Sequence, residues 1–309
     1  MRVALAVLLV VFLGLTAQAT LISPRHFLDA RLPMLLGGAI VSMPAWLLLL
    51  LAARARRAPW RWLVVAVAWG AFAAPWLAFV GEAILGNAFA ALQSTLQIQP
   101  AAMEAVPGVV MAPIVEELAK VAGTLIVLGG VRRVGTRISV ALGAAIGGLV
   151  GLWFGLAEIS HHLGEFVDNL GYTDLSGAFV IDGNAVRQFA TAQVVSRLVL
   201  DGLSNHALFS ALAGVGVVTM WQGRRRMAIG WFIAALVAHG SLNSIGVTLG
   251  QWVLDALFQA QREGPPFRIP LLVDGWLASA IAFLVAEGWA ALLLVRRLRR
   301  TDGIGVPSG

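Results

Sequence analysis

The sequence of 309 residues contains no cysteine. Without thiols the chain can form neither a disulfide framework nor a thiolate metal site. Any metal ion must therefore be bound by histidine, aspartate, glutamate or asparagine side chains.

Charged residues are also scarce. They make up 12% of the chain, whereas hydrophobic residues make up 59% and the mean hydropathy is +0.84. A soluble domain has about 25% charged residues, so this composition excludes both an ordinary soluble enzyme and a disordered chain. It is the composition of a polytopic membrane protein.

Lysine is nearly absent, because Lys120 is the single lysine among 22 basic residues. Val121 follows it where a phosphate-binding Walker loop needs serine or threonine, so that loop is excluded. The net charge of +6 comes from arginines in short clusters between apolar runs. Such clusters indicate membrane topology, and we expect no nucleic-acid partner.

The apolar runs predict an all-α transmembrane helix bundle with about eight spans, since a spanning helix needs roughly 20 apolar residues. Residues 1–309 form a single membrane domain, and the helices that carry polar motifs cover about residues 108–250. Residues 1–20 fit either a first transmembrane helix or a signal-like segment. The expected spans are 3–20, 32–53, 61–81, 108–129, 138–160, 194–221, 228–250 and 273–295. Residues 83–106 and 163–193 are expected to be outer loops, the first with a partly amphipathic helix.

Every second loop is basic, which by the positive-inside rule predicts that both termini are cytoplasmic. The clusters are Arg54, Arg56, Arg57 and Arg61; Arg132, Arg133 and Arg137; Arg224, Arg225 and Arg226; and Arg296, Arg297, Arg299 and Arg300.

Four charged residues fall inside the predicted spans 108–129 and 138–160, where each costs about 2.5–3.5 kcal/mol on insertion scales. They are Glu116, Glu117, Lys120 and Glu158. The spacing puts Glu116 and Lys120 on one helix face as an ion pair. A purely structural ion pair is one interpretation, but two adjacent glutamates exceed what one lysine neutralises, which favours a functional site.

Two further spans contain histidine. Counting 1.5 Å per residue puts Glu116, His206 and His239 roughly 12 to 18 Å below the outer ends of their helices. Asn243 shares a face with His239. Each histidine alone could be a packing residue, but the shared depth favours one site. His161 and His162 fit histidines at the outer interface.

Two histidines with one carboxylate as ligands and another carboxylate left free are the components of a hydrolytic zinc site. The sequence also contains Glu116-Glu117-x-x-Lys120, Phe154-x-x-x-Glu158, Asn205-His206-Ala207 and His239-x-x-x-Asn243 in this order. The ordered set resembles the PrsW family of bacterial intramembrane proteases, which is related to the CAAX-protease and bacteriocin-processing superfamily.

The resemblance implies an intramembrane endopeptidase of the bacterial inner membrane. Its substrate would be a membrane-anchored protein resembling an anti-sigma factor, cut near the outer half of the bilayer. By resemblance, Glu116 would be the water-activating base with Glu117 as its partner. Glu158, His206 and His239 would bind zinc, and Asn243 or Lys120 would stabilise the oxyanion.

Three other interpretations stay open. The glutamates and histidines could activate water without a metal. The intramembrane Glu, Lys and His residues could instead form the relay of a proton-coupled transporter, although no inverted second copy of the Glu-Glu-x-x-Lys segment is present. A non-catalytic scaffold would not be expected to keep such costly residues.

Overall fold

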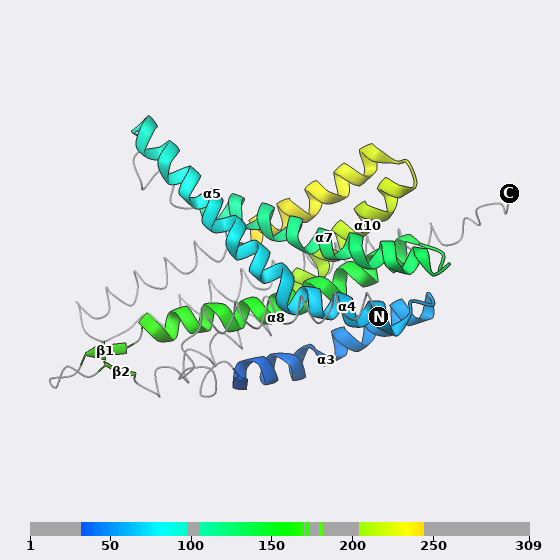
Figure 1. The fold of residues 1–309 in the computed structure, drawn as a ribbon, viewed down its shortest axis with the longest axis horizontal. Coiled ribbons are helices and arrows are strands. Elements are labelled where there is room, and N and C mark those ends of the chain that lie inside the picture. Colours follow the sequence, from blue (N-terminus) through cyan, green and yellow to red (C-terminus); the bar gives the residue numbers. More distant parts are fainter. Residues whose placement is uncertain (1–31, 98–105, 170, 174–178, 182–203, 244–309) are drawn as a thin grey trace, which may run out of the picture.

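The computed structural model describes residues 32–97, 106–169, 171–173, 179–181 and 204–243 (Figure 1). The expected spans 3–20 and 273–295 lie outside these residues, as does the last arginine cluster. The described part is a helical bundle, which confirms the helical fold class. It adds one short antiparallel pair of strands, β1 (Gly171–Thr173) and β2 (Phe179–Ile181), in the expected outer loop 163–193.

The first described helices run to one end of the bundle and back. Helix α3 (Leu32–Ala55) is followed by a tight turn and by α4 (Trp60–Ala68), the π-helical turn η2 (Trp69–Ala73) and α5 (Ala74–Leu96). The last three elements form one continuous helix of 37 residues.

The helix continues to Leu96 instead of ending near residue 81. Polar residues between 82 and 96 led us to expect an outer loop, but this stretch contains no proline to stop the helix. It ends at Gln97, which takes a left-handed conformation with φ 53°. Because the helix exceeds the roughly 20 residues of a single span, α5 projects beyond the bundle (Figure 1).

The next two helices carry the charged motifs. The π-helical turn η3 (Pro107–Met111) leads into α7 (Ala112–Arg133), and α8 (Val140–Asn169) returns beside it. Both π-turns stand just before a proline in a helix, Pro75 and Pro113. Proline lacks the N–H that an α-helix needs at that position, and a π-turn relieves the conflict.

Helix α10 (Ser204–Trp221) packs along α8 through a row of glycines. A side chain at Gly143 or Gly147 would overlap the carbonyl groups of Gly214 or Ser210. The two backbones therefore approach as closely as small-residue interfaces in membranes allow. A turn at Gly223, with φ 80°, leads to the last described helix, residues 225–243.

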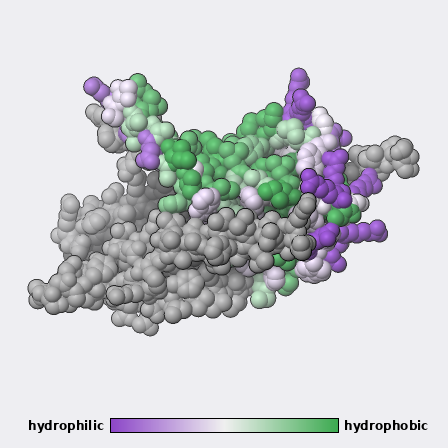
Figure 2. Space-filling view, in the orientation of Figure 1, coloured by the Kyte–Doolittle hydropathy of each residue, from purple (hydrophilic) through white to green (hydrophobic). Residues whose placement is uncertain are grey.

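The described surface is apolar around the middle of the bundle and hydrophilic at the right-hand end and at the tip that projects at the upper left (Figure 2). Two helices, Trp60–Leu96 and Val140–Glu158, are long and apolar enough to cross a membrane. The arginine-rich turns after α3, α7 and α10 lie at the same end of the bundle (Figure 1). This agrees with the alternation of charge in the sequence, while the count of eight spans and the cytoplasmic termini stay predictions.

Candidate active site

Helix α7 brings two carboxylates and an ammonium group into the interior. Glu116, Glu117 and Lys120 are 5%, 0% and 0% exposed. Lys120 Nζ lies 2.7 Å from Glu117 Oε1 and 3.4 Å from Glu116 Oε2. The expected Glu116–Lys120 pair is present, and Glu117, three residues before the lysine, is the closer partner.

His239, from helix 225–243, points both ring nitrogens at this pair of glutamates. Its Nδ1 lies 3.1 Å from Glu117 Oε1, and its Nε2 lies 3.6 Å from Glu116 Oε2. The ring stacks on Phe209 with a centroid distance of 5.1 Å and an interplanar angle of 19°. Stacking on Phe209 fixes the plane of the His239 ring, and the contacts with the two carboxylates fix which way its nitrogens point within that plane.

His206, from the first turn of α10, approaches the same glutamate from the other side. Its Nδ1 lies 4.0 Å from Glu116 Oε2, and its Nε2 lies 2.7 Å from Glu158 Oε2 on α8. Gly151 and Gly155 make this possible, because a Cβ at Gly151 would overlap the His206 carbonyl and one at Gly155 would lie 2.9 Å from the His206 ring.

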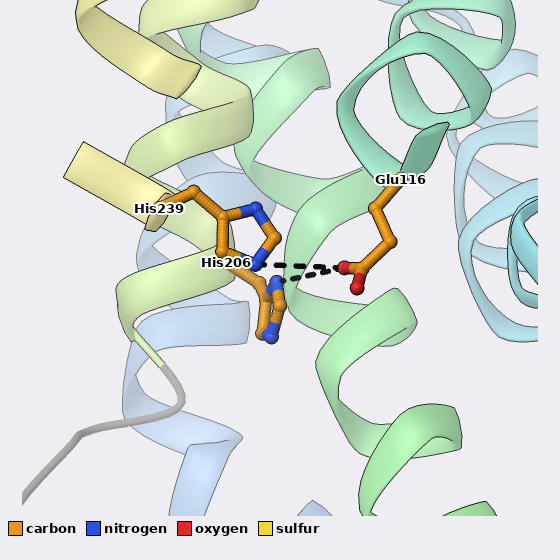
Figure 3. A group of neighbouring side chains, drawn as sticks. All are labelled: Glu116, His206 and His239. Atoms are coloured by element: carbon orange, nitrogen blue, oxygen red, sulfur yellow. Dashed lines mark ion pairs between the residues drawn. The ribbon is translucent and has the colours of Figure 1, made fainter. Parts of the chain in front are cut away.

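Glu116, His206 and His239 thus converge from three helices (Figure 3). One ligand atom from each lies within 4.8 Å of the others. Ligand atoms of a tetrahedral zinc ion are about 3.4 Å apart, so the separations of 3.6 and 4.0 Å around Glu116 Oε2 need only a small contraction. The three residues therefore fit a divalent metal ion.

The two remaining carboxylates, Glu117 and Glu158, contact the imidazole nitrogens that are not in the proposed set of ligand atoms. Glu117 contacts Nδ1 of His239, and Glu158 contacts Nε2 of His206. Metal-binding histidines usually donate their second ring N–H to such a carboxylate, which fixes the ring and its tautomer. This arrangement favours Glu116 as a ligand and Glu158 as an orienting residue, whereas the family resemblance implies Glu158 as a ligand and Glu116 as the base; these roles stay predictions.

Asn243, expected at the oxyanion, donates a hydrogen bond from Nδ2 to the Gly108 carbonyl at 2.8 Å. Gly108 lies in the π-turn η3, where its carbonyl would pair with the N–H five residues ahead. That residue is Pro113, which has no N–H. Asn243 therefore satisfies a carbonyl that the helix itself leaves unpaired, and it ties helix 225–243 to the start of α7.

One aromatic residue of the sequence motifs, Phe154, forms part of the wall of the site. Phe154 is buried, and its ring lies 4.2 Å from Lys120 Nζ and 5.3 Å from the His206 ring. His161 and His162 lie in α8 one turn beyond Glu158, and Asn205 lies in the first turn of α10, but their side chains are outside the described part.

Phe209 and Trp69 also pack around the site and were not predicted from the sequence. Phe209 lies three residues after His206, so it is on the same helix face. Trp69, in η2, donates from Nε1 to the Ala119 carbonyl at 2.9 Å, between the glutamates and the lysine of α7. Its ring occupies the space that Gly123 leaves open, so a glycine in an apolar helix was the available signal.

A buried glutamate and two histidines facing one another inside a helical membrane bundle are the arrangement expected of a membrane-embedded metal-dependent hydrolase. The family model described as PrsW family intramembrane metalloprotease matches residues 58–261, about two thirds of the chain. The chain therefore belongs to the PrsW family and is an intramembrane protease, which confirms the resemblance. Comparisons with curated proteins and with solved structures give no match.

Proposed function

We propose that the protein is a zinc-dependent endopeptidase that cuts membrane-anchored proteins, with Glu116, His206 and His239 as the metal ligands. The observation that carries the proposal is the convergence of these three side chains, each from a different helix, within 4.8 Å. A bound zinc ion would lower the pKa of its water and polarise the scissile carbonyl. The family supports the metal but not the identity of zinc.

The remaining side chains divide the other tasks. Glu117 and Glu158 orient the imidazoles of His239 and His206, each through one short contact. Glu117 Oε2 is buried and has no hydrogen-bond partner among the described residues. We assign this oxygen the proton released when water attacks the carbonyl carbon, and that proton passes to the leaving amine. Lys120 supplies positive charge beside the developing oxyanion.

The site is proposed to lie in the outer half of the bilayer. Glu116 stands four residues from the start of α7, whereas Arg132 near its end is about 24 Å further along the helix. His239 is likewise about 20 Å from the arginines at the start of its helix. If the arginine-rich end is cytoplasmic, as the charge pattern predicts, the chemistry takes place near the outer boundary of the bacterial inner membrane.

The proposed substrate is a protein with a single membrane anchor, resembling an anti-sigma factor. Peptide bonds within a helix are shielded by its own hydrogen bonds, so the substrate must unwind locally to present a carbonyl. The segment to be cut is therefore expected at the outer end of a transmembrane helix, where unwinding exposes the backbone to water.

The test is cleavage of a membrane-anchored reporter by the purified protein in liposomes. We expect wild type to cut, and Glu116→Gln and His206→Ala to be inactive although each still shows a cooperative thermal unfolding transition. Full cleavage by either variant would refute the assignment. If chelated, metal-free wild type cuts at the full rate, the metal-independent alternative replaces it. Ion flux without cleavage would instead favour the transporter.

A further inference from the structure

The most unusual group in the site is the ammonium of Lys120, the single lysine of the chain. It is fully buried and lies 3.1 Å from His206 Nδ1, 3.4 Å from Glu116 Oε2 and 2.7 Å from Glu117 Oε1. Two of these three atoms belong to the proposed metal ligands. Lys120 therefore contacts the ligand atoms that a metal ion would need.

The distances leave no room for both cations. A metal ion bonded to Glu116 Oε2 and His206 Nδ1 at about 2.0–2.2 Å has to lie between these two atoms, which are 4.0 Å apart. Lys120 Nζ, in its present position, would then be only about 2 to 3 Å from the ion. Two positive charges at that separation in a buried site repel each other strongly, and an ammonium has no lone pair with which to bind the metal.

We propose that Lys120 and the metal ion compete for Glu116 and His206, so that metal loading requires the lysine to withdraw to Glu117. The inference rests on the proposed metal site. Before loading, the ammonium is the counter-ion that keeps Glu116 and His206 facing each other. Its shortest contact, with Glu117, does not involve a proposed ligand atom and can persist after loading.

The competition has a measurable consequence for metal affinity. If the binding-competent state, with Lys120 away from both ligands, is populated less than about a tenth of the time, the apparent affinity falls at least about tenfold. An unbranched apolar residue at position 120 removes the competitor and keeps the side-chain volume. Lys120→Met should therefore bind zinc at least about tenfold more tightly than wild type.

The experiment measures zinc affinity of the full-length detergent-solubilised protein by competition with a fluorescent chelator. Lys120→Arg keeps the charge and should bind as weakly as wild type. Thr124→Val, one turn further on the same buried helix face, is the matched control and should not change the affinity. Tighter zinc binding by Lys120→Met that is lost in Lys120→Met/His206→Ala supports the inference.

Equal or weaker zinc binding by Lys120→Met than by wild type overturns the inference and leaves the proposed function standing. No zinc binding by either protein overturns both. A second measurement uses wild type alone, in case the variant does not fold. Selective ¹³C labelling of lysine side chains gives one Cε signal, because the chain has one lysine. Stoichiometric zinc should shift this signal, and an unmoved signal with zinc bound overturns the competition.

Discussion

Two helix interfaces lie next to His206, one between α8 and α10 and one between α7 and helix 225–243, and they are made of different kinds of contact. Between α8 and α10 the contact is made by glycines whose hydrogens face backbone carbonyls, so that the helices are held at a fixed short distance. Between α7 and helix 225–243 the contact is made by buried polar groups, Glu116 and Glu117 against His239. The first interface sets where the backbone lies, and the second sets where ring nitrogens and carboxylates point.

The difference explains why the chain can keep so many costly groups inside a membrane. Buried charges are tolerated when partners are in place at the moment of packing. The glycine interface provides this because the contact between the α8 and α10 backbones fixes the position of the start of α10, and with it the position of His206. Such a site is expected to lose activity in two separable ways. A substitution can change the spacing of α8 and α10 at the glycine interface, or it can remove a side chain that takes part in the reaction.

The largest effect is expected at the chemical interface. Glu116→Gln removes a proposed ligand and should lower the cleavage rate by at least about 1000-fold, because metal catalysis contributes several kcal/mol. Glu158→Gln is the matched variant. Its amide can still accept a hydrogen bond from His206, so its cleavage rate should fall only about 10- to 100-fold. Reporter cleavage under identical conditions compares the two, and the reverse order would restore the roles inferred from sequence.

The glycine interface between α8 and α10 is expected to be most sensitive to the addition of one methyl group. Gly151→Ala places a Cβ against the His206 carbonyl, and overpacking of this kind costs about 1–3 kcal/mol of stability. We expect a lower thermal unfolding midpoint in detergent together with reduced cleavage. Gly129→Ala is the matched control, because nothing lies within 4 Å of the added Cβ. If both variants unfold at the same temperature, the glycine interface does not position His206.

A smaller effect is expected where Trp69 meets α7. Trp69→Phe removes the hydrogen bond to the Ala119 carbonyl, worth about 1 kcal/mol. Trp62→Phe removes an indole of similar size whose N–H has no partner among the described residues. Thermal unfolding of both variants isolates the hydrogen bond from the lost ring volume. An equally large loss in Trp62→Phe would show that Trp69 acts through volume alone.

The smallest effect on cleavage is expected at Asn243. Because its amide donates to Gly108, Asn243→Ala should lower stability by about 1 kcal/mol. It should lower cleavage less than about tenfold, whereas loss of an oxyanion donor would cost about 100-fold or more. The steady-state cleavage rate of the folded variant distinguishes the two roles of Asn243. A loss of the larger size would return Asn243 to the oxyanion role suggested by the family resemblance.

Much of this site could be predicted from sequence because burying charge is costly. Glu116, Lys120 and His239 stand out in apolar helices, and the similar depths of Glu116, His206 and His239 predicted one site. The arginine clusters predicted which ends of the described helices lie together. These inferences use only the positions of charged residues along the chain. In a membrane protein those positions indicate the depth of a residue and the side on which a loop lies.

Other features depend on tertiary contacts that no single helix encodes. The rotation of the His206 and His239 rings decides whether Glu116 or Glu158 faces the ligand atoms, and that rotation is set by neighbours on other helices. The extension of α5 to Leu96 was missed because polar residues on a projecting helix resemble those of a loop. The contact between Trp69 and α7 joins residues 50 positions apart.

The central claim is that Glu116, His206 and His239 hold one metal ion while Glu158 only orients His206. The most direct measurement is the zinc bound per chain after saturation and desalting of wild type, Glu116→Gln and Glu158→Gln. The account predicts about one zinc in wild type and in Glu158→Gln, and almost none in Glu116→Gln. Zinc retained by Glu116→Gln but lost from Glu158→Gln would contradict it.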